Sequence, residues 1–282
     1  MASPSTFISA VNPPSSPSQP PVEKPSPPPV NILPSQLAQT YSYVHPTILL
    51  ALGVTRFNAL VENPVSELLN DLPWLALLQL SYVILCLPPA GSLASDSSSS
   101  EKSQRSTSGT TRPGKPGPRR KHSGKNLWAG IWAKLMPAFL SVALTFFIAT
   151  PVIAVLLVLF GAPLTTHNYE TILCAAHMAL LSSSGLTYVH GLDASVWKEV
   201  WGFARPVDAV WGGAFGTVLG AWFGAIPIPL DWDRPWQAFP ITILAGAYMG
   251  YVVGTLVSRT PLLYGKRLQF THGQDEEEEK TN

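Results

Sequence analysis

The chain alternates between long apolar segments and segments rich in proline, serine and charged residues. A stretch of about 20 apolar residues is long enough to cross the hydrocarbon core of a bilayer as an α-helix. We therefore predict an all-α integral membrane protein with about six transmembrane helices. The predicted spans are residues 37–60, 72–87, 135–160, 171–189, 207–224 and 238–258. The third span contains Pro151, where we expect a kink.

Two segments differ sharply from these spans in composition. Residues 1–34 and 89–127 consist mainly of proline, serine and charged residues. Such segments cannot bury enough apolar surface to offset the entropy lost on ordering, so we predict that both are disordered. The expected organisation is a tail at 1–34, two helices at 35–88, a basic loop at 89–127, a four-helix core at 128–258 and a second tail at 259–282.

The distribution of positive charge predicts the orientation in the membrane. With six spans, both tails and the second and fourth loops share one side, which carries sixteen of the 18 lysine and arginine residues. The opposite side carries only Arg56 and Arg234. Because loops rich in lysine and arginine stay in the cytosol, we predict that both termini are cytosolic. Glu67 and Asp71 are then expected in the short first loop on the far side.

Glycine recurs at every fourth position in the last two predicted spans. A spacing of four keeps the glycines near one face of a helix. In lipid, such smooth faces favour association by letting two backbones approach closely. We therefore predict helix packing through these stripes, either against each other or against a helix of another protein. The stripes are Gly212, Gly216, Gly220 and Gly224 in the first helix, and Gly246, Gly250 and Gly254 in the second.

The loop between the two stripes, residues 226–237, is the most structured polar element. Asp233 is a candidate N-cap for the last helix, and Trp232 and Trp236 suit a lipid–water boundary. One interpretation is a capped turn with aromatic anchors. The other is that the loop contacts a polar lipid head group or a partner protein. The candidate contact residues are Asp231, Trp232, Asp233, Arg234, Pro235, Trp236 and Gln237.

Other sequence features give little support to catalysis. The chain lacks a glycine-rich phosphate loop, a nucleophile elbow and a zinc-protease helix motif. Asp231 and Asp233 are two residues apart without a neighbouring histidine or cysteine, which is a weak catalytic pattern. His45 and His177 fall within spans, but not at the spacing of a helical metal site. We expect no catalytic residue, no cofactor and no metal.

The remaining polar features have structural interpretations. Cys86 and Cys174 fall within spans, where we expect buried thiols and no disulfide. Asp208 is expected to cap the fifth helix or to pair with Arg205. The basic run at 119–121 fits attraction to anionic lipid better than binding to nucleic acid, so no nucleic-acid partner is expected.

Two stretches of the sequence resemble a known family. The segment from Gly220 to Ala225, followed by Pro227 to Gln237, closely resembles the signature of the PIG-F family of glycosylphosphatidylinositol (GPI) anchor biosynthesis. Leu159 to Pro163 and the residues around Pro240 continue the likeness, which covers about half the chain. Phe239 departs from the pattern, because a tryptophan is expected there. The proline-rich tail and basic loop are similar to insertions of a fungal-type member.

The resemblance implies a multi-pass protein of the endoplasmic-reticulum membrane. Its expected role is that of a non-catalytic subunit that stabilises ethanolamine-phosphate transferases, PIG-O-like and PIG-G-like. Membrane lipid, including GPI precursors, is a further expected partner. The alternative function is direct binding or transfer of a phosphoethanolamine or GPI head group by the 226–237 loop. A small transporter, with His45 and His177 as its polar groups, ranks last.

Overall fold

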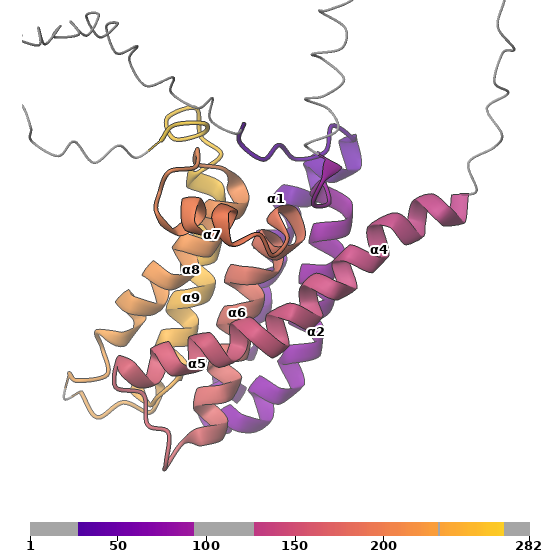
Figure 1. Ribbon diagram of the computed structural model, residues 1–282. Helices are drawn as coiled ribbons and strands as arrows, with labels where there is room; N and C mark the ends of the chain where they lie inside the picture. The colour runs from indigo at the N-terminus through magenta and orange to yellow at the C-terminus, as the bar shows by residue number, and fades with distance from the viewer. Residues whose placement is uncertain (1–27, 93–126, 231, 268–282) are drawn as a thin grey trace, which may run out of the picture.

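The computed structural model describes residues 28–92, 127–230 and 232–267. Most of the two segments predicted to be disordered, and the end of the second tail, therefore lie outside the described residues. All secondary structure within the described ranges is helical (Figure 1). The elements are α1 (Gln36–Glu62), α2 (Pro64–Cys86), α4 (Leu127–Leu144), the π-turn η1 (Thr145–Ala149), α5 (Thr150–Leu159), α6 (Asn168–His190), α7 (Ala194–Trp201), α8 (Ala209–Ala225), the 3-10 turn η2 (Pro235–Gln237) and α9 (Ile241–Val257).

The helices confirm the predicted all-α membrane fold. Four helical segments are long and apolar enough to cross a bilayer: α1, α2, Ile131–Leu159 and α6. The apolar helices α8 and α9 have 17 residues each. At roughly 1.5 Å per residue, each is about 26 Å long, close to the hydrocarbon thickness of about 30 Å. The second span is longer than the predicted residues 72–87, because α2 starts eight residues before the predicted position.

The early start of α2 also corrects the placement of two acidic residues. Glu67 and Asp71 lie on the first two turns of α2 and not in the first loop. Arg56 on α1 pairs with both, at 3.1 Å from Glu67 and 3.7 Å from Asp71. Asn63 alone separates the two helices, and Pro64 starts α2, where a missing N–H costs little. Glu67 and Asp71 can therefore lie within a helix, because Arg56 of the neighbouring helix neutralises charge beside them.

The third span contains a break at the expected place. The turn η1 lies between α4 and α5, directly before Pro151 in the first turn of α5. Proline lacks the N–H of a regular helix and its ring clashes with the carbonyl four residues earlier. The Thr150 N–H accordingly bonds to the Thr145 carbonyl, five residues earlier. The combined helix runs obliquely across one face of the bundle (Figure 1).

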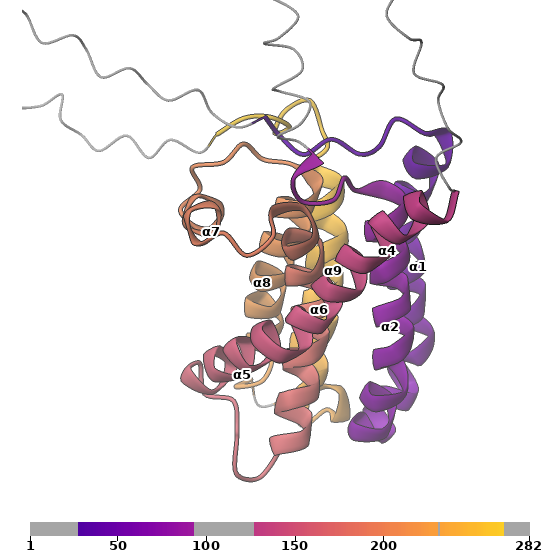
Figure 2. The ribbon, with the colours of Figure 1, turned by 45° about the vertical axis from the view of Figure 1, so that its right-hand side comes forward.

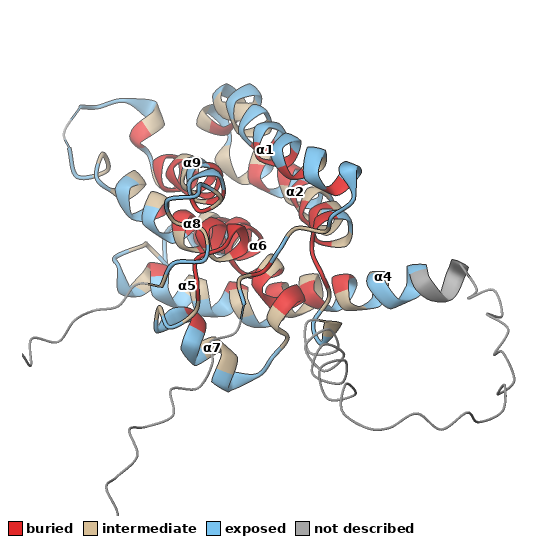
Figure 3. Cartoon of the chain, turned by 90° about the horizontal axis from the view of Figure 1, so that it is seen from above, coloured by how far each residue is buried: buried red, intermediate tan, exposed pale blue. Residues whose placement is uncertain are grey.

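Helix α6 forms the centre of the bundle, with α2, α8, α9 and the α4–α5 segment around it (Figure 3). It is buried over 83% of its most apolar window, against 11–28% for the other three long spans. Two of its serine hydroxyls donate hydrogen bonds within the helix. Ser182 Oγ donates to the Met178 carbonyl at 2.7 Å, and Ser184 Oγ donates to the Leu180 carbonyl at 2.6 Å. In a bilayer, polar groups need such internal partners because water is absent. Cys174 of α6 is free and buried, as is Cys86 of α2, as predicted.

The polar connections divide between the two ends of the bundle. One end contains residues 28–35, the α6–α8 connection with α7, and residues 258–267 (Figures 1 and 2). The other contains the α1–α2 turn, the α5–α6 connection and the loop 226–240 (Figures 1 and 2).

Asp208 joins two segments at the first of these ends. Its Oδ1 accepts from the N–H groups of Val210 (2.9 Å) and Trp211 (2.8 Å), and its Oδ2 accepts from Val30 (3.2 Å). The capping role of Asp208 is confirmed. Arg205 forms its ion pair with Glu199, at 3.1 Å, and not with Asp208. The Asp208 carboxylate accepts from backbone N–H groups instead. The carboxylate thus ties the start of α8 to the segment that precedes α1.

We expect Asp208→Ala to lower the stability of the protein by roughly 2 kcal/mol, the upper part of the range for loss of an N-cap. The cause is the loss of acceptors for three buried N–H groups. The apparent melting temperature of the purified protein in mild detergent measures the effect. Asp193→Ala, which removes the exposed cap of the short helix α7, is the matched control and should have a much smaller effect. Equal effects at the two positions would contradict the role of Asp208 as a junction.

Candidate functional site

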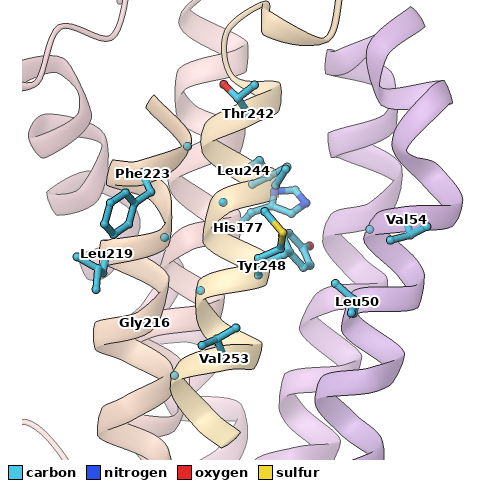
Figure 4. A pocket seen from close by; sticks show the side chains of 18 of the residues that line it. Leu50, Val54, His177, Gly216, Leu219, Phe223, Thr242, Leu244, Tyr248 and Val253 are labelled. Carbon is cyan, nitrogen blue, oxygen red and sulfur yellow. The ribbon is translucent and has the colours of Figure 1, made fainter. Parts of the chain in front are cut away.

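Helices α8 and α9 lie side by side in antiparallel orientation, with the two glycine stripes against each other (Figures 1 and 4). A Cβ atom built on Gly216 would lie 2.1 Å from the Gly250 carbonyl oxygen. One on Gly220 would lie 2.1 Å from that of Gly246. Contacts this short are incompatible with any side chain, so the backbones touch directly. We call this contact the glycine seam; its members are Gly212, Gly216, Gly220, Gly224, Gly246, Gly250 and Gly254.

The seam extends over the full length of both helices. At one end a Cβ on Gly224 would lie 2.2 Å from the Thr242 carbonyl oxygen. At the other, a Cβ on Gly212 would lie 2.1 Å from the Ser258 hydroxyl oxygen. Of the two arrangements open from the sequence, the structure thus has the stripes packed against each other. Neither stripe is free to receive a helix of another protein.

Large apolar side chains occupy the outer faces of the same two helices. On α8 the exposed residues include Leu219, Trp222 and Phe223, and on α9 they include Met249 and Val253. Glycines occupy the faces where α8 and α9 meet, so these large side chains lie on the outside of the hairpin. These outer faces meet lipid or another protein.

The loop that joins α8 to α9 is held together by one amide side chain. Gln237 is buried, and its Nε2 donates to the carbonyls of Pro227 (2.8 Å) and Leu230 (2.7 Å). Its Oε1 accepts from the Arg234 N–H at 3.1 Å. The amide is therefore committed to the loop itself and is not available to a ligand. Sequence reasoning placed Gln237 among the contact residues, whereas its bonds are internal.

Asp233 does not cap the last helix, so that prediction was wrong. Arg234 precedes the 3-10 turn η2, and α9 begins only at Ile241, after Pro240. A helix starting after Asp233 would have to pass through Pro240, whose ring excludes it from a helix interior. Asp233 instead has a positive φ of 48°, a conformation in which aspartate is enriched.

The exposed part of the loop is small and polar. Trp232, Asp233, Arg234 and Pro235 are exposed, and Trp236 is half-buried. The rings of Trp232 and Trp236 are 5.9 Å apart. Asp231 lies outside the described residues. The loop thus presents an acid and a base beside a tryptophan pair at one end of the bundle.

A cavity that sequence reasoning missed lies between α1 and the α8–α9 hairpin (Figure 4). It has a volume of about 1100 Å³ and mainly apolar walls. Arg56, Asp71 and His177 are among its few polar lining residues. An intramembrane charge is the signal that could have identified it, but Asp71 was assigned to a loop. Among the described residues, no group of three or more histidine, cysteine, aspartate or glutamate side chains is placed to hold a metal ion.

Comparison with known proteins assigns the chain to a family. The model of the GPI biosynthesis protein family Pig-F matches residues 44–259, from the first half of α1 to the residues just after α9. The chain belongs to the Pig-F family. The match includes the glycine seam, the 226–240 loop and the cavity. The family resemblance inferred from the hairpin is therefore confirmed.

Relatives within the Pig-F family extend the comparison. "Glycosylphosphatidylinositol anchor biosynthesis protein 11" of Aspergillus fumigatus is 59% identical over 296 residues, 99% of each chain. The protein of the same name in Neurospora crassa is 46% identical over 239 residues, 85% of this chain and 80% of the relative. The human "GPI ethanolamine phosphate transferase, stabilizing subunit" is 38% identical over 125 residues, 42% of this chain and 55% of the relative. No solved structure matches the chain.

We expect Gly220→Ala to destabilise this Pig-F protein by about 1–3 kcal/mol, the usual cost of an overpacked core. The added methyl group would lie 2.1 Å from the Gly246 carbonyl oxygen and would push α8 and α9 apart. The apparent melting temperature in detergent measures the loss. Gly53→Ala is the matched control, because a Cβ there meets nothing within 4 Å. That variant should be at least as stable as the parent, since alanine favours the helix. A Gly220→Ala protein that melts like the parent would contradict the seam.

Proposed function

We propose that the chain is a non-catalytic subunit that stabilises an ethanolamine-phosphate transferase acting on GPI-anchor precursors. The observation that carries this proposal is the Pig-F match over residues 44–259, together with the name of the human relative, a stabilizing subunit. The expected partners are PIG-O-like and PIG-G-like transferases. The proposed location is the endoplasmic-reticulum membrane.

The proposed role needs a binding surface and no reaction centre. A protein that binds only the folded form of a partner stabilises it by mass action, by about 2.7 kcal/mol at a concentration one hundred times Kd. A gain of this size changes the amount of a marginally stable membrane enzyme several-fold. The described part of the chain is built to supply such a surface, since its helices expose large apolar side chains on their outer faces.

The glycine seam changes where the partner is expected to bind. The sequence left open whether the glycine stripes pack on each other or form the docking face, and the structure has them closed against each other within the chain. A substitution in the seam would therefore affect a partner indirectly, through the shape of the hairpin. We propose that the partner meets the part of the outer apolar face that carries Trp222, which does not line the cavity, and the exposed loop residues Trp232, Asp233 and Arg234.

The proposed orientation has both termini in the cytosol and the 226–240 loop in the lumen. Lys198, Arg205 and Arg259 lie at the end of the bundle that contains α7. Arg234 belongs to the loop at the opposite end. This asymmetry agrees with the tendency of positive charge to stay in the cytosol.

Cysteine labelling of microsomes tests this orientation. The native Cys86 and Cys174 are buried, so background labelling should be low. We expect Lys198→Cys to react with a membrane-impermeant maleimide in intact microsomes, and Asp233→Cys only after permeabilisation. Both positions are exposed in the structure. The reverse pattern would contradict the proposed orientation.

A second candidate function is direct contact with a lipid head group by the loop. Asp233 and Arg234 favour it, because they are exposed on a loop that Gln237 holds in shape. Within the described residues, neither side chain takes part in an ion pair. Transfer of a phosphoethanolamine group by the loop itself is the strongest form of this alternative.

Removing the charges of Asp233 and Arg234 distinguishes the stabilising role from the head-group function. In cells that lack the native protein, the stabilising role predicts that Asp233→Asn with Arg234→Gln retains a co-purifying transferase and its normal amount. GPI precursors should then still receive ethanolamine phosphate, as shown by mass spectrometry of the lipids. Lys198→Gln with Glu199→Gln, an exposed acid and base at the opposite end, is the matched control.

A normal amount of transferase with unmodified precursors would favour the head-group function. Failure of the unaltered chain to co-purify with any such transferase, or to affect its amount, would overturn the stabilising role.

A further inference from the structure

The cavity between α1 and the α8–α9 hairpin is long and mainly apolar (Figure 4). Its lining includes Leu50 and Val54 of α1, Leu219 and Phe223 of α8, and Val253 of α9 (Figure 4). All five side chains are exposed in the isolated chain, so the cavity is open along its side. In a membrane this opening admits lipid chains, because the surrounding solvent is hydrocarbon.

Unsatisfied polar atoms lie in the half of the cavity near the α1–α2 turn. His177 lines it with a fully buried ring whose Nε2 has no hydrogen-bond partner. Asp71 Oδ1 and Thr242 Oγ1 are also buried without a hydrogen bond. A buried polar atom without a partner costs free energy, and water to relieve it is scarce at this depth. The cavity is therefore large enough for a ligand and is lined by residues with polar atoms that have no hydrogen-bond partner.

Two of these three atoms are acceptors, and the third, the Thr242 hydroxyl, can donate or accept. His177 Nδ1 lies 2.8 Å from the Leu173 carbonyl oxygen, so Nδ1 carries the hydrogen and the neutral Nε2 accepts. Asp71 Oδ1 is an acceptor too, 3.7 Å from Arg56 Nε. Glu67 and Asp71 place two carboxyl groups beside the single guanidinium group of Arg56. A cationic group with several N–H donors complements this set.

We propose that the cavity binds one diacyl phospholipid with a primary ammonium head group. The acyl chains lie along the apolar walls, and the ammonium group donates to Asp71 and His177. Because the chains gain little on moving from one hydrocarbon environment to another, the head group determines which lipid binds. This inference concerns the isolated chain and does not depend on the proposed stabilising role.

The polar atoms that line the cavity favour a lipid over a helix of a partner protein. The cavity volume of about 1100 Å³ is at the upper end of the range for small-molecule sites. A partner helix would leave the buried acceptors unmet unless it carried a donor at this depth.

Gly53 provides a way to fill the cavity without disturbing the fold. It lines the cavity on α1, and a Cβ there meets nothing within 4 Å. Gly53→Leu therefore adds bulk where a lipid chain would lie. Ala51→Leu is the matched control, because Ala51 is exposed and about 200° away around the same helix.

Photolabelling of the full-length protein in phosphatidylcholine vesicles tests the proposal. The vesicles contain a trace of phosphatidylethanolamine or phosphatidylcholine, each with the same photoreactive acyl chain. We expect the ethanolamine probe to label α1 and α9 peptides roughly tenfold more than the choline probe, the effect of one hydrogen bond to a charged group. Gly53→Leu should abolish that labelling, and Ala51→Leu should retain it. Asp71→Asn should bring the two probes close to equal labelling.

Three results would overturn the proposal. The first is equal labelling of the unaltered protein by the two probes. The second is full labelling of Gly53→Leu, which needs no change in the charged residues and so tests the cavity even if Asp71→Asn fails to fold. The third is crosslinking of Leu50→Cys to a helix of a co-purified protein with loss of lipid labelling, which would identify a partner helix as the occupant.

Discussion

Direct backbone contact between α8 and α9 is the constraint on which the rest of the structure depends. Where Gly216 meets Gly250 and Gly220 meets Gly246, the two helices have no side chains between them. Dispersion contacts over a long interface then replace the hydrophobic effect, which is weak between helices in lipid. The contact also decides where everything else on the hairpin lies. Large residues such as Trp222 and Met249 are on the outer faces, and the connecting loop must span only a short gap.

Polar groups within the bundle follow the rule that a bilayer offers no water. Serine and threonine hydroxyls bond to carbonyls of their own helix, as Ser184 does in α6 and Thr217 does in α8. Arg56 pairs with two carboxylates of the neighbouring helix. Against this background, several buried polar atoms in the described residues have no hydrogen-bond partner, among them both ring nitrogens of His45, Nε2 of His177 and Oδ1 of Asp71. His177 and Asp71 line the same cavity, where a ligand can supply the missing donors.

The sequence predicted the helices and the family well, because hydropathy and glycine spacing are local signals. The fourth span, expected at 171–189, is observed as Asn168–His190. The prediction failed where a distant residue decides the outcome. Glu67 and Asp71 looked like loop residues until Arg56 of α1 was placed beside them. The side chain of Gln237 makes three hydrogen bonds to backbone atoms of its own loop. No sequence pattern identifies such bonds, so the sequence placed Gln237 among the candidate contact residues.

The structure also decides between two roles that the sequence left open. The glycines were expected either to pack the hairpin or to receive a partner, and the structure has them packing the hairpin. Among the described residues of the hairpin, the outer faces and the loop remain available to a partner protein. The seam then acts on a partner by fixing the distance and angle at which these surfaces are presented. A cavity filled by lipid on the flank of the same hairpin would add to this rigidity, since a bound molecule that contacts both α1 and α9 holds them at one spacing. In the proposed complex, recognition of the partner would therefore depend on residues of this chain that the partner does not touch.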